Sequence, residues 1–232
     1  MSLEKVNVKG VEIYPFTSFP QVLRFTEEHP GIMISVNAEI ILNANAEMRQ
    51  FINRHIGYCD GAGPLMVLKK MGYKDAIKMA GCELWLKMAE KYCRSKSFYL
   101  VGSRQEVIEE TVSRLESQFP GIHVLGYRNG YIQSDAERQA LVDDILRKKP
   151  DVVFVAMGAP KQERLMAELE RRHKAIYMGL GGSFDVYTKH VKRAPEWWVN
   201  HNVEWLYRLI HQPSRIKRQI KLVKFAWWIW RK

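Results

Sequence analysis

The residue best placed for acid–base chemistry is Asp60, which closes the apolar run Ile56–Asp60. The segment Gly61–Pro64 follows it, and its glycines let the backbone come close to a ligand. A carboxylate in that place has the chemistry of a general base or of a metal ligand. An aspartate before a helix is also a common helix cap. All three interpretations of Asp60 stay open from the residues alone.

A second polar segment, Gly158–Glu163, directly follows the apolar run Asp151–Met157. Pro160 suits the first position of a helix, and the unpaired N–H groups at such a helix end attract anions. Lys161 and Gln162 are expected at the same rim. The segment therefore predicts a phosphate-binding turn.

The glycine-rich segment Gly179–Asp185 is a third candidate. It does not fit the GxGxxG fingerprint, because Asp185 occupies the last position, so its signal for NAD is weak. A glycine turn beside a nucleotide remains, with Asp185 able to hydrogen-bond a sugar or a base. An enzyme that depends on NAD or S-adenosylmethionine is the rival interpretation of these residues.

Three arginines near the C-terminus, Arg208, Arg215 and Arg218, are spaced by seven and three residues. On one continuous helix this spacing places them on one face, although Pro213 interrupts the continuity. A guanidinium stays charged and donates hydrogen bonds in pairs, which suits a diphosphate. The alternative is a solvated basic face.

Apolar, strand-like runs alternate with helical patterns as far as Gly179. We expect strands at Gly31–Asn37, Ile56–Asp60, Ser97–Gly102, His123–Gly126, Asp151–Met157 and Ala175–Gly179. We expect helices at Ala38–Arg54, Glu106–Gln118, Asp135–Lys148 and Pro160–His173. The alternation predicts an α/β fold with a Rossmann-like, mostly parallel sheet flanked by helices. Ligands of such folds bind at the carboxyl ends of strands, which selects Asn37, Asp60, Gly102-Ser103, Gly158–Gln162 and Gly179–Asp185.

The positive charge of the chain is concentrated at its C-terminal end. Val186–Lys232 holds 11 Lys/Arg against two acidic residues, and the whole chain of 232 residues has a net charge of +11. Six of the seven tryptophans lie between Trp197 and Trp230. Indole rings and basic groups both favour the headgroup layer of a membrane. No apolar run is long enough to span a bilayer, so we expect a cytoplasmic chain that lies on the membrane surface.

Two helices are expected in this C-terminal segment, Glu196–His211 and one that begins at Pro213. The second has an apolar stripe beside a face of lysines, which is the pattern of an interfacial amphipathic helix. We therefore divide the chain into a core, residues 1–194, and a helical appendage, residues 195–232. The same stripe would also pack on the core. A basic, aromatic segment is shared with nucleic-acid-binding proteins, although no groove-reading motif is present.

Together, these segments resemble the WecG/TagA/CpsF family of bacterial glycosyltransferases (glycosyltransferase family 26), from about Val8 to Lys224. The likeness rests on SVNAEI (Ser35–Ile40), YCDGAG (Tyr58–Gly63), AGCELW (Ala80–Trp85), FYLVG (Phe98–Gly102), NGY (Asn129–Tyr131), MGAPKQE (Met157–Glu163), GLGGSFDVYTKHVKRAP (Gly179–Pro195) and EWLYRLIHQPSRIKRQ (Glu204–Gln219). The last two are most similar to the WecG branch, which transfers N-acetylmannosaminuronic acid (ManNAcA) during enterobacterial common antigen assembly.

The resemblance implies an inverting transfer from a UDP-sugar to undecaprenyl-diphosphate-linked GlcNAc at the inner face of the bacterial cell membrane. In the TagA branch the donor is UDP-ManNAc, so transfer of ManNAc or another hexose for teichoic acid, capsule or exopolysaccharide is the alternative. The implied partners are the donor, the lipid-linked acceptor and the membrane surface, and a homo-oligomer stays open. A nucleic-acid-binding protein is the alternative of another class.

The resemblance also implies roles for single residues. Asp60 matches the proposed catalytic base. Residues that match substrate-binding positions are Ser35, Asn37, Gln162, Asp185, Arg208, Arg215 and Arg218. Lys78 stands where many members have arginine, which keeps the charge but loses the paired donors. No cofactor or metal ion is implied, and the three cysteines lack the CxxC spacing of zinc sites.

Overall fold

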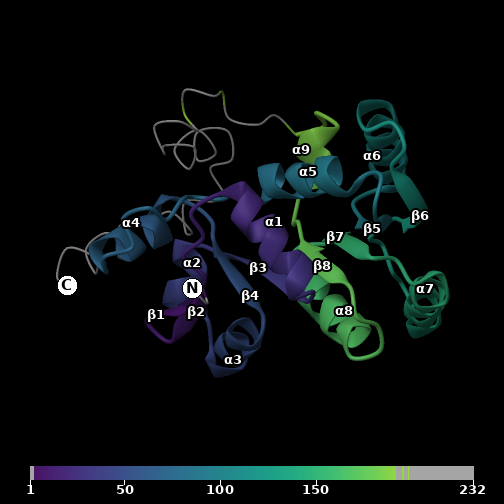
Figure 1. Cartoon of the computed structure of the whole chain (residues 1–232). Helices are drawn as coiled ribbons and strands as arrows, with labels where there is room; N and C mark the ends of the chain where they lie inside the picture. Colours follow the sequence, from purple (N-terminus) through teal and green to yellow (C-terminus); the bar gives the residue numbers. More distant parts are fainter. Residues whose placement is uncertain (1–2, 192–194, 196–197, 199–232) are drawn as a thin grey trace. The chain divides into compact units, whose positions relative to one another are not determined.

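The computed structural model describes residues 3–191, Pro195 and Trp198 (Figure 1). The chain divides into two compact units. The first contains the residues up to Ser18 together with Ile34–Ala80, and the second contains Phe19–Met33 and Gly81–Lys192. The predicted appendage, residues 195–232, and its three arginines lie outside the described residues, apart from Pro195 and Trp198.

The described strands are β1 (Val6–Val8), β2 (Val11–Ile13), β3 (Ile32–Val36), β4 (Ile56–Cys59), β5 (Ser97–Gly102), β6 (His123–Arg128), β7 (Val152–Ala156) and β8 (Ile176–Gly179). Six of them form one sheet in the order β4-β3-β8-β7-β5-β6. The ladders from β3 through β8, β7 and β5 to β6 are parallel. Strands β1 and β2 form a separate antiparallel hairpin. The prediction of an α/β fold with a mostly parallel sheet is confirmed.

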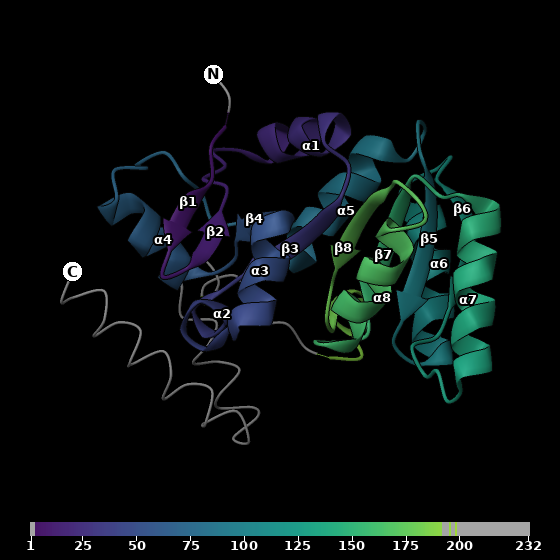
Figure 2. The same cartoon turned by 90° about the horizontal axis from the view of Figure 1, so that it is seen from below.

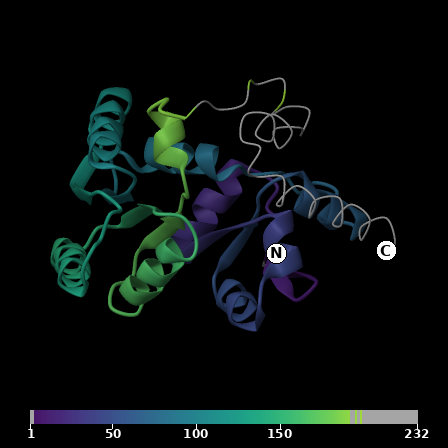
Figure 3. The same ribbon diagram turned by 180° about the vertical axis from the view of Figure 1, so that it is seen from behind.

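The first unit carries helices α2 (Ala38–Asn43), α3 (Ala46–Arg54) and α4 (Ala62–Lys70). The second carries α1 (Phe19–Glu28), α5 (Gly81–Tyr92), α6 (Gln105–Gln118), α7 (Asp135–Lys148), α8 (Lys161–Glu170) and α9 (Ser183–Tyr187). Within this second unit, α5, α6 and α9 cover one face of the strands and α7 and α8 cover the other (Figures 1 and 3). The view from below shows α7 and α8 in front of β5, β7 and β8 (Figure 2).

The core of the second unit is built on β7, whose five residues are all buried. Such a continuous run of apolar side chains is expected of a strand with helices on both faces. Trp85 of α5 is fully buried and stands edge-on to Phe154 of β7 at 5.6 Å and to Phe184 of α9 at 5.5 Å. These ring contacts fix both helices to the strand whose end carries Gly158–Glu163.

In the first unit, the β1–β2 hairpin is held to β4. The backbone N–H of Tyr14 donates to the carbonyl of Gly57 at 2.9 Å. A Cβ atom at Gly57 would stand 2.5 Å from the carbonyl oxygen of Glu12, so only glycine allows this close approach. The hairpin therefore supports the strand that ends at Asp60.

The prediction of one helix over Ala38–Arg54 is wrong. The structure has two helices, because Asn45 is extended and its side chain accepts a hydrogen bond of 2.8 Å from the N–H of Met48. An asparagine side chain that competes for backbone donors favours a cap over a helix interior. Ala44 caps the end of α2, and Asn45 starts α3.

Candidate active site

Ser35 and Asp60 meet at the carboxyl edge of the first unit. Ser35 lies on β3, Asp60 directly follows β4, and the two strands are neighbours in the sheet. The Ser35 hydroxyl donates to Oδ2 of Asp60 at 2.5 Å. The N–H of Asp60 donates to the carbonyl of Val36 at 2.9 Å. The Ser35 hydroxyl therefore helps to orient the carboxylate, and the bond to Val36 helps to hold the backbone that carries it.

The residue at the N-cap of α4 is Gly61, with a φ of 92°. A left-handed φ is strained for residues with a side chain, so glycine suits this turn. Asp60 therefore stands one position before the cap. The turn delivers the carboxylate at the strand end and starts α4 at Ala62.

Cys59 and Lys78 complete the surroundings of Asp60. The pKa of the Cys59 thiol is raised to about 12, mainly by burial and also by the charge of Asp60, while the charge of Lys78 acts to lower it. The N–H of Met79 donates to the carbonyl of Cys59 at 2.8 Å, which brings the segment of Lys78 beside the end of β4. A thiol with this pKa stays protonated near neutral pH and is a poor nucleophile. The charged groups that act on the Cys59 thiol are the carboxylate of Asp60 and the ammonium of Lys78.

Asn37 has a structural partner in the first unit. Its side-chain oxygen accepts from the N–H of Ile40 at 3.0 Å, and the residue is the N-cap of α2. This contact uses the acceptor end of the amide. A role of Asn37 in binding substrate stays a prediction.

Gln162 links two loops of the second unit. Its Oε1 accepts from the N–H of Gly158 at 3.2 Å and from the N–H of Gly181 at 3.0 Å. The side chain is only 8% exposed, and its Nε2 donates to Glu163 at 3.0 Å. A Cβ atom at Gly179 would stand 2.6 Å from that Nε2. Gln162 therefore holds the turn after β7 to the turn after β8, and its predicted contact with substrate stays a prediction.

Asp185 is paired with Ser103 in the same unit. The Ser103 hydroxyl donates to Oδ2 of Asp185 at 2.5 Å, and the carbonyl of Ser103 accepts from the N–H of Gly130 at 2.9 Å. Three segments thus meet at the carboxyl end of β5, namely the end of the strand, the NGY motif at Asn129–Tyr131 and α9. Tyr131 is 62% exposed there.

An open cavity of about 450 Å³ lies at the carboxyl ends of β6 and β7. Its lining includes Arg138, Lys161 and Arg164. Arg138 donates twice to Glu168, at 2.9 and 2.6 Å. Two further cations from the first turn of α8 thus face a cavity at a helix N-terminus, an arrangement that attracts anions. Helix α8 begins at Lys161 with Pro160 as its N-cap, so the predicted start at Pro160 is wrong by one residue.

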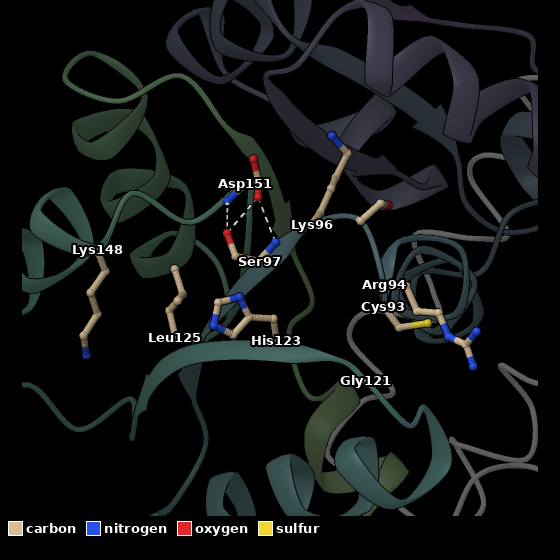
Figure 4. A pocket seen from close by; sticks show the side chains of 10 residues that line it. Cys93, Arg94, Lys96, Ser97, Gly121, His123, Leu125, Lys148 and Asp151 are labelled. Atoms are coloured by element: carbon tan, nitrogen blue, oxygen red, sulfur yellow. Dashed lines mark hydrogen bonds between the residues drawn. The ribbon is translucent and has the colours of Figure 1, made fainter.

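A second cavity, of about 440 Å³, opens at the amino ends of β5 and β6 (Figure 4). Asp151 there accepts hydrogen bonds from the N–H and the hydroxyl of Ser97, at 2.8 and 2.7 Å. Burial acts to raise the pKa of Asp151, but these hydrogen bonds and neighbouring cations lower it below its ordinary value. Arg94 and Lys148 point in different directions (Figure 4). No group of charges converges on a ligand position in this cavity.

The structure therefore joins Ser35 to Asp60 in the first unit and places Lys78 where its charge acts on Cys59, the residue before Asp60. In the second unit, Gln162 and Asp185 lie on loops at the carboxyl ends of strands. Arg208, Arg215 and Arg218 lie outside the described residues. Ser103 is expected at a strand end but has no predicted role. Its hydrogen bond to Asp185 joins residues 82 positions apart, which no local pattern reveals.

The part of the chain that the structure describes also bears on metal binding and on membrane insertion. Within residues 3–191 and at the two isolated positions, no group of three or more His, Cys, Asp or Glu side chains is arranged to hold a metal ion. In the same residues, every helix is too short or too polar to cross a bilayer.

The sequence profile of the family described as "Glycosyl transferase WecG/TagA/CpsF family" matches residues 6–232. The match covers nearly the whole chain and includes every segment at the strand ends discussed above. The chain belongs to the WecG/TagA/CpsF family and is therefore a glycosyltransferase.

Proposed function

We propose that the chain moves N-acetylmannosaminuronic acid from its UDP donor to GlcNAc on undecaprenyl diphosphate, with Asp60 as the general base. The observation that carries the proposal is the 2.5 Å hydrogen bond from Ser35 to Asp60 at the carboxyl edge of β3 and β4. A base must hold its carboxylate in one orientation before the acceptor arrives. Family membership supplies the reaction class, since such enzymes use a nucleotide-sugar donor and a lipid-linked acceptor.

The proposed step is a single displacement at the anomeric carbon. The acceptor hydroxyl oxygen forms the new bond to that carbon while its proton passes to the Asp60 carboxylate. The bond between the anomeric carbon and the UDP oxygen breaks on the opposite face, and UDP leaves with the electron pair. The configuration at the anomeric carbon is therefore inverted. General-base help of this kind contributes about 10²–10⁴-fold to the rate.

The donor is proposed to lie with its nucleotide near Ser103 and Asp185. A carboxylate held at 2.5 Å by a serine can accept hydrogen bonds from a ribose or a base. The acidic sugar calls for a cation near the reacting carbon. Lys78, whose charge acts on Cys59 beside Asp60, supplies one. A neutral sugar such as ManNAc gains less from that cation.

The charge on departing UDP must also be neutralised. We assign this to Arg208, Arg215 and Arg218 of the appendage, which is proposed to lie on the inner membrane surface. The segment that docks on the bilayer would then also supply the cations of the site. Removal of residues 194–232 should abolish turnover while the rest stays folded, and EDTA should leave turnover of the full chain unchanged. Full activity after truncation, or loss with EDTA that Mg²⁺ restores, would contradict this assignment.

The proposed donor is tested by offering UDP-ManNAcA, UDP-ManNAc and UDP-GlcNAc separately to the full chain with a synthetic GlcNAc-diphosphate lipid. The measurement is UDP release together with the mass of the lipid product. The proposal expects the product with ManNAcA to form fastest. Faster transfer of ManNAc or another hexose would assign the chain to a different donor within the same family.

A further inference from the structure

A surface on α4 and the turn after it combines exposed apolar side chains with lysines. Met66 is 54% exposed, Met71 49% and Tyr73 41%. They are three of the six large apolar side chains that are exposed among the described residues. The opposite side of α4 is buried through Pro64, Val67 and Leu68. We call the exposed set the α4 surface, and its residues are Met66, Lys69, Lys70, Met71, Tyr73 and Lys74.

The charge of this surface has one sign. No acidic residue occurs from Gly61 to Lys74, whereas three lysines do. Lys69 and Lys70 follow Met66 by three and four positions, so all three side chains share one face of the helix. Residues Lys69–Lys74 are exposed without interruption, and Asp75, also exposed, is the first acidic residue after them. The α4 surface is therefore a cationic patch with apolar side chains set into it.

The positive charge of the α4 surface decides which partner can cover it: the C-terminal segment, a second copy of the chain or a lipid surface. The C-terminal segment Val186–Lys232 holds 11 basic residues against two acidic ones, so it would meet like charge on the α4 surface. A second copy of the chain would bring the same three lysines against them. Anionic lipid headgroups offer the opposite charge, and the layer beneath them accepts the side chains of methionine and tyrosine. The lipid surface is the occupant that satisfies both properties.

Helix α4 starts next to Asp60, so a membrane contact on α4 would set the distance between Asp60 and the lipid. Helix α4 starts two positions after Asp60, and Met66 lies four residues into it, about 6 Å along the helix axis. A diphosphate and one sugar must span the space between a membrane-embedded lipid tail and the reacting hydroxyl. A helix that starts beside the carboxylate and ends in the headgroup layer sets that space.

We propose that the α4 surface is a membrane contact that binds anionic lipid and places Asp60 above the headgroup layer. The inference rests on the proposed function in one respect, that the acceptor is lipid-linked. It adds a second contact, separate from the appendage, and predicts that lipid binding depends on α4 even when the appendage is intact.

Binding is tested with the full chain and flotation on vesicles of phosphatidylcholine containing one-third phosphatidylglycerol. Lys69→Gln/Lys70→Gln/Lys74→Gln should lower the partition coefficient by about fivefold per lysine, on the order of 100-fold in all. Met66→Ser/Met71→Ser/Tyr73→Ser should lower it as well. The matched controls are Lys91→Gln/Lys149→Gln/Lys174→Gln and Tyr127→Ser, which change exposed residues of the second unit and should bind as wild type. Equal binding of the α4 variants and the controls would overturn the proposal.

A direct probe guards against variants that lose binding through poor folding. A nitrobenzoxadiazole fluorophore on Met66→Cys, in a Cys82→Ser/Cys93→Ser background, should shift to shorter wavelength and resist iodide quenching when vesicles are added. The same label on Tyr127→Cys should not change. No change at position 66 while the protein floats would show that the appendage alone binds lipid, and would refute the role of α4.

Turnover separates this proposal from the proposed function. With a short-chain, water-soluble GlcNAc-diphosphate acceptor, the α4 variants should release UDP at the wild-type rate. With a long-chain acceptor in vesicles, kcat/KM should fall in proportion to vesicle binding. Equal loss with both acceptors would contradict the membrane role of α4. Absence of UDP release by the wild type with either acceptor would refute the proposed function, whereas the fluorophore result would still decide the lipid contact.

Discussion

The Ser103 hydroxyl donates a hydrogen bond of 2.5 Å to Asp185, and the same kind of pair is formed in the other unit by Ser35 and Asp60. In each case the serine comes from one strand end and the aspartate from another segment at the carboxyl edge. Both carboxylates are oriented before any ligand binds. We assign the first pair to the nucleotide and the second to the reacting sugar, and the predictions below separate these roles.

Asp185→Asn should weaken the binding of UDP. A hydrogen bond to a charged group contributes about 1.5–3 kcal/mol, so the Kd should rise by roughly 10- to 100-fold. Isothermal titration with UDP measures this directly. Ser103→Ala removes only the orienting hydroxyl and should cost less. If Asp185→Asn binds UDP as tightly as wild type, Asp185 does not contact the nucleotide.

Ser35→Ala should lower kcat with little change in UDP affinity, because it removes the hydroxyl that holds Asp60. We expect a loss of about tenfold, the rate equivalent of about 1.4 kcal/mol. Ser35→Thr keeps the hydroxyl and suits a strand, so it should retain most of the activity. Steady-state kinetics of both variants provide the measurement. Equal activity of the alanine and threonine variants would mean that the hydrogen bond to Asp60 is not used.

Gln162→Ala should lower the stability of the fold and should have only a small effect on UDP binding. It leaves the N–H groups of Gly158 and Gly181 without this acceptor, at about 1–3 kcal/mol for an unsatisfied buried group. The drop in Tm should be about 2–4 °C for each kcal/mol. Gln139→Ala, at an exposed position of α7, is the control and should unfold as wild type. An unchanged Tm for Gln162→Ala together with weak UDP binding would point to a purely substrate-binding residue.

The buried thiol of Cys59 should make the fold less stable at alkaline pH. Burial and the charge of Asp60 raise its pKa from 9.0 to about 12, although the charge of Lys78 acts to lower it. Above pH 9 the unfolded chain loses this proton while the folded chain keeps it, so the free energy of unfolding falls between pH 9 and 12.

This contribution is measured by comparing Cys59→Ala with wild type in urea at pH 8 and pH 10. The stability advantage of the wild type should be smaller at pH 10, because the variant lacks the thiol that ionises on unfolding. A constant difference for Cys59→Ala would mean that its thiol titrates alike in both states.

Several elements could be predicted from the sequence because their signal is local. The strand Ser97–Gly102 and the helix Asp135–Lys148 have the predicted bounds. Their apolar runs are long, and Ser134 and Pro150 mark the helix ends. The β1–β2 hairpin was missed, since strands of three residues carry too few positions for a period to show. Helices α1, α4, α5 and α9 were also missed. Helix α5 is defined by packing of Trp85 against rings distant in sequence.

The candidate site could be predicted only in part. The strand-end rule selected Asp60 and the segment of Asp185 because each follows an apolar run. It could not reveal the partners Ser35 and Ser103 in their actual roles, since those hydrogen bonds join residues 25 and 82 positions apart. The strand-end rule also could not distinguish a polar side chain that binds substrate from one that supports the fold. Gln162 and Asn37 accept hydrogen bonds from backbone N–H groups of a loop and of a helix, respectively.

The most direct test of the account replaces the carboxylate of Asp60 by an amide. Asp60→Asn keeps the size of the side chain but cannot take a proton from the acceptor hydroxyl. Turnover, measured as UDP release with the lipid-linked acceptor, should fall by about 10²–10⁴-fold while UDP binds as in wild type. Asp75→Asn, an exposed aspartate of the same unit, is the matched control and should stay fully active. Undiminished turnover by Asp60→Asn would show that Asp60 is not the base.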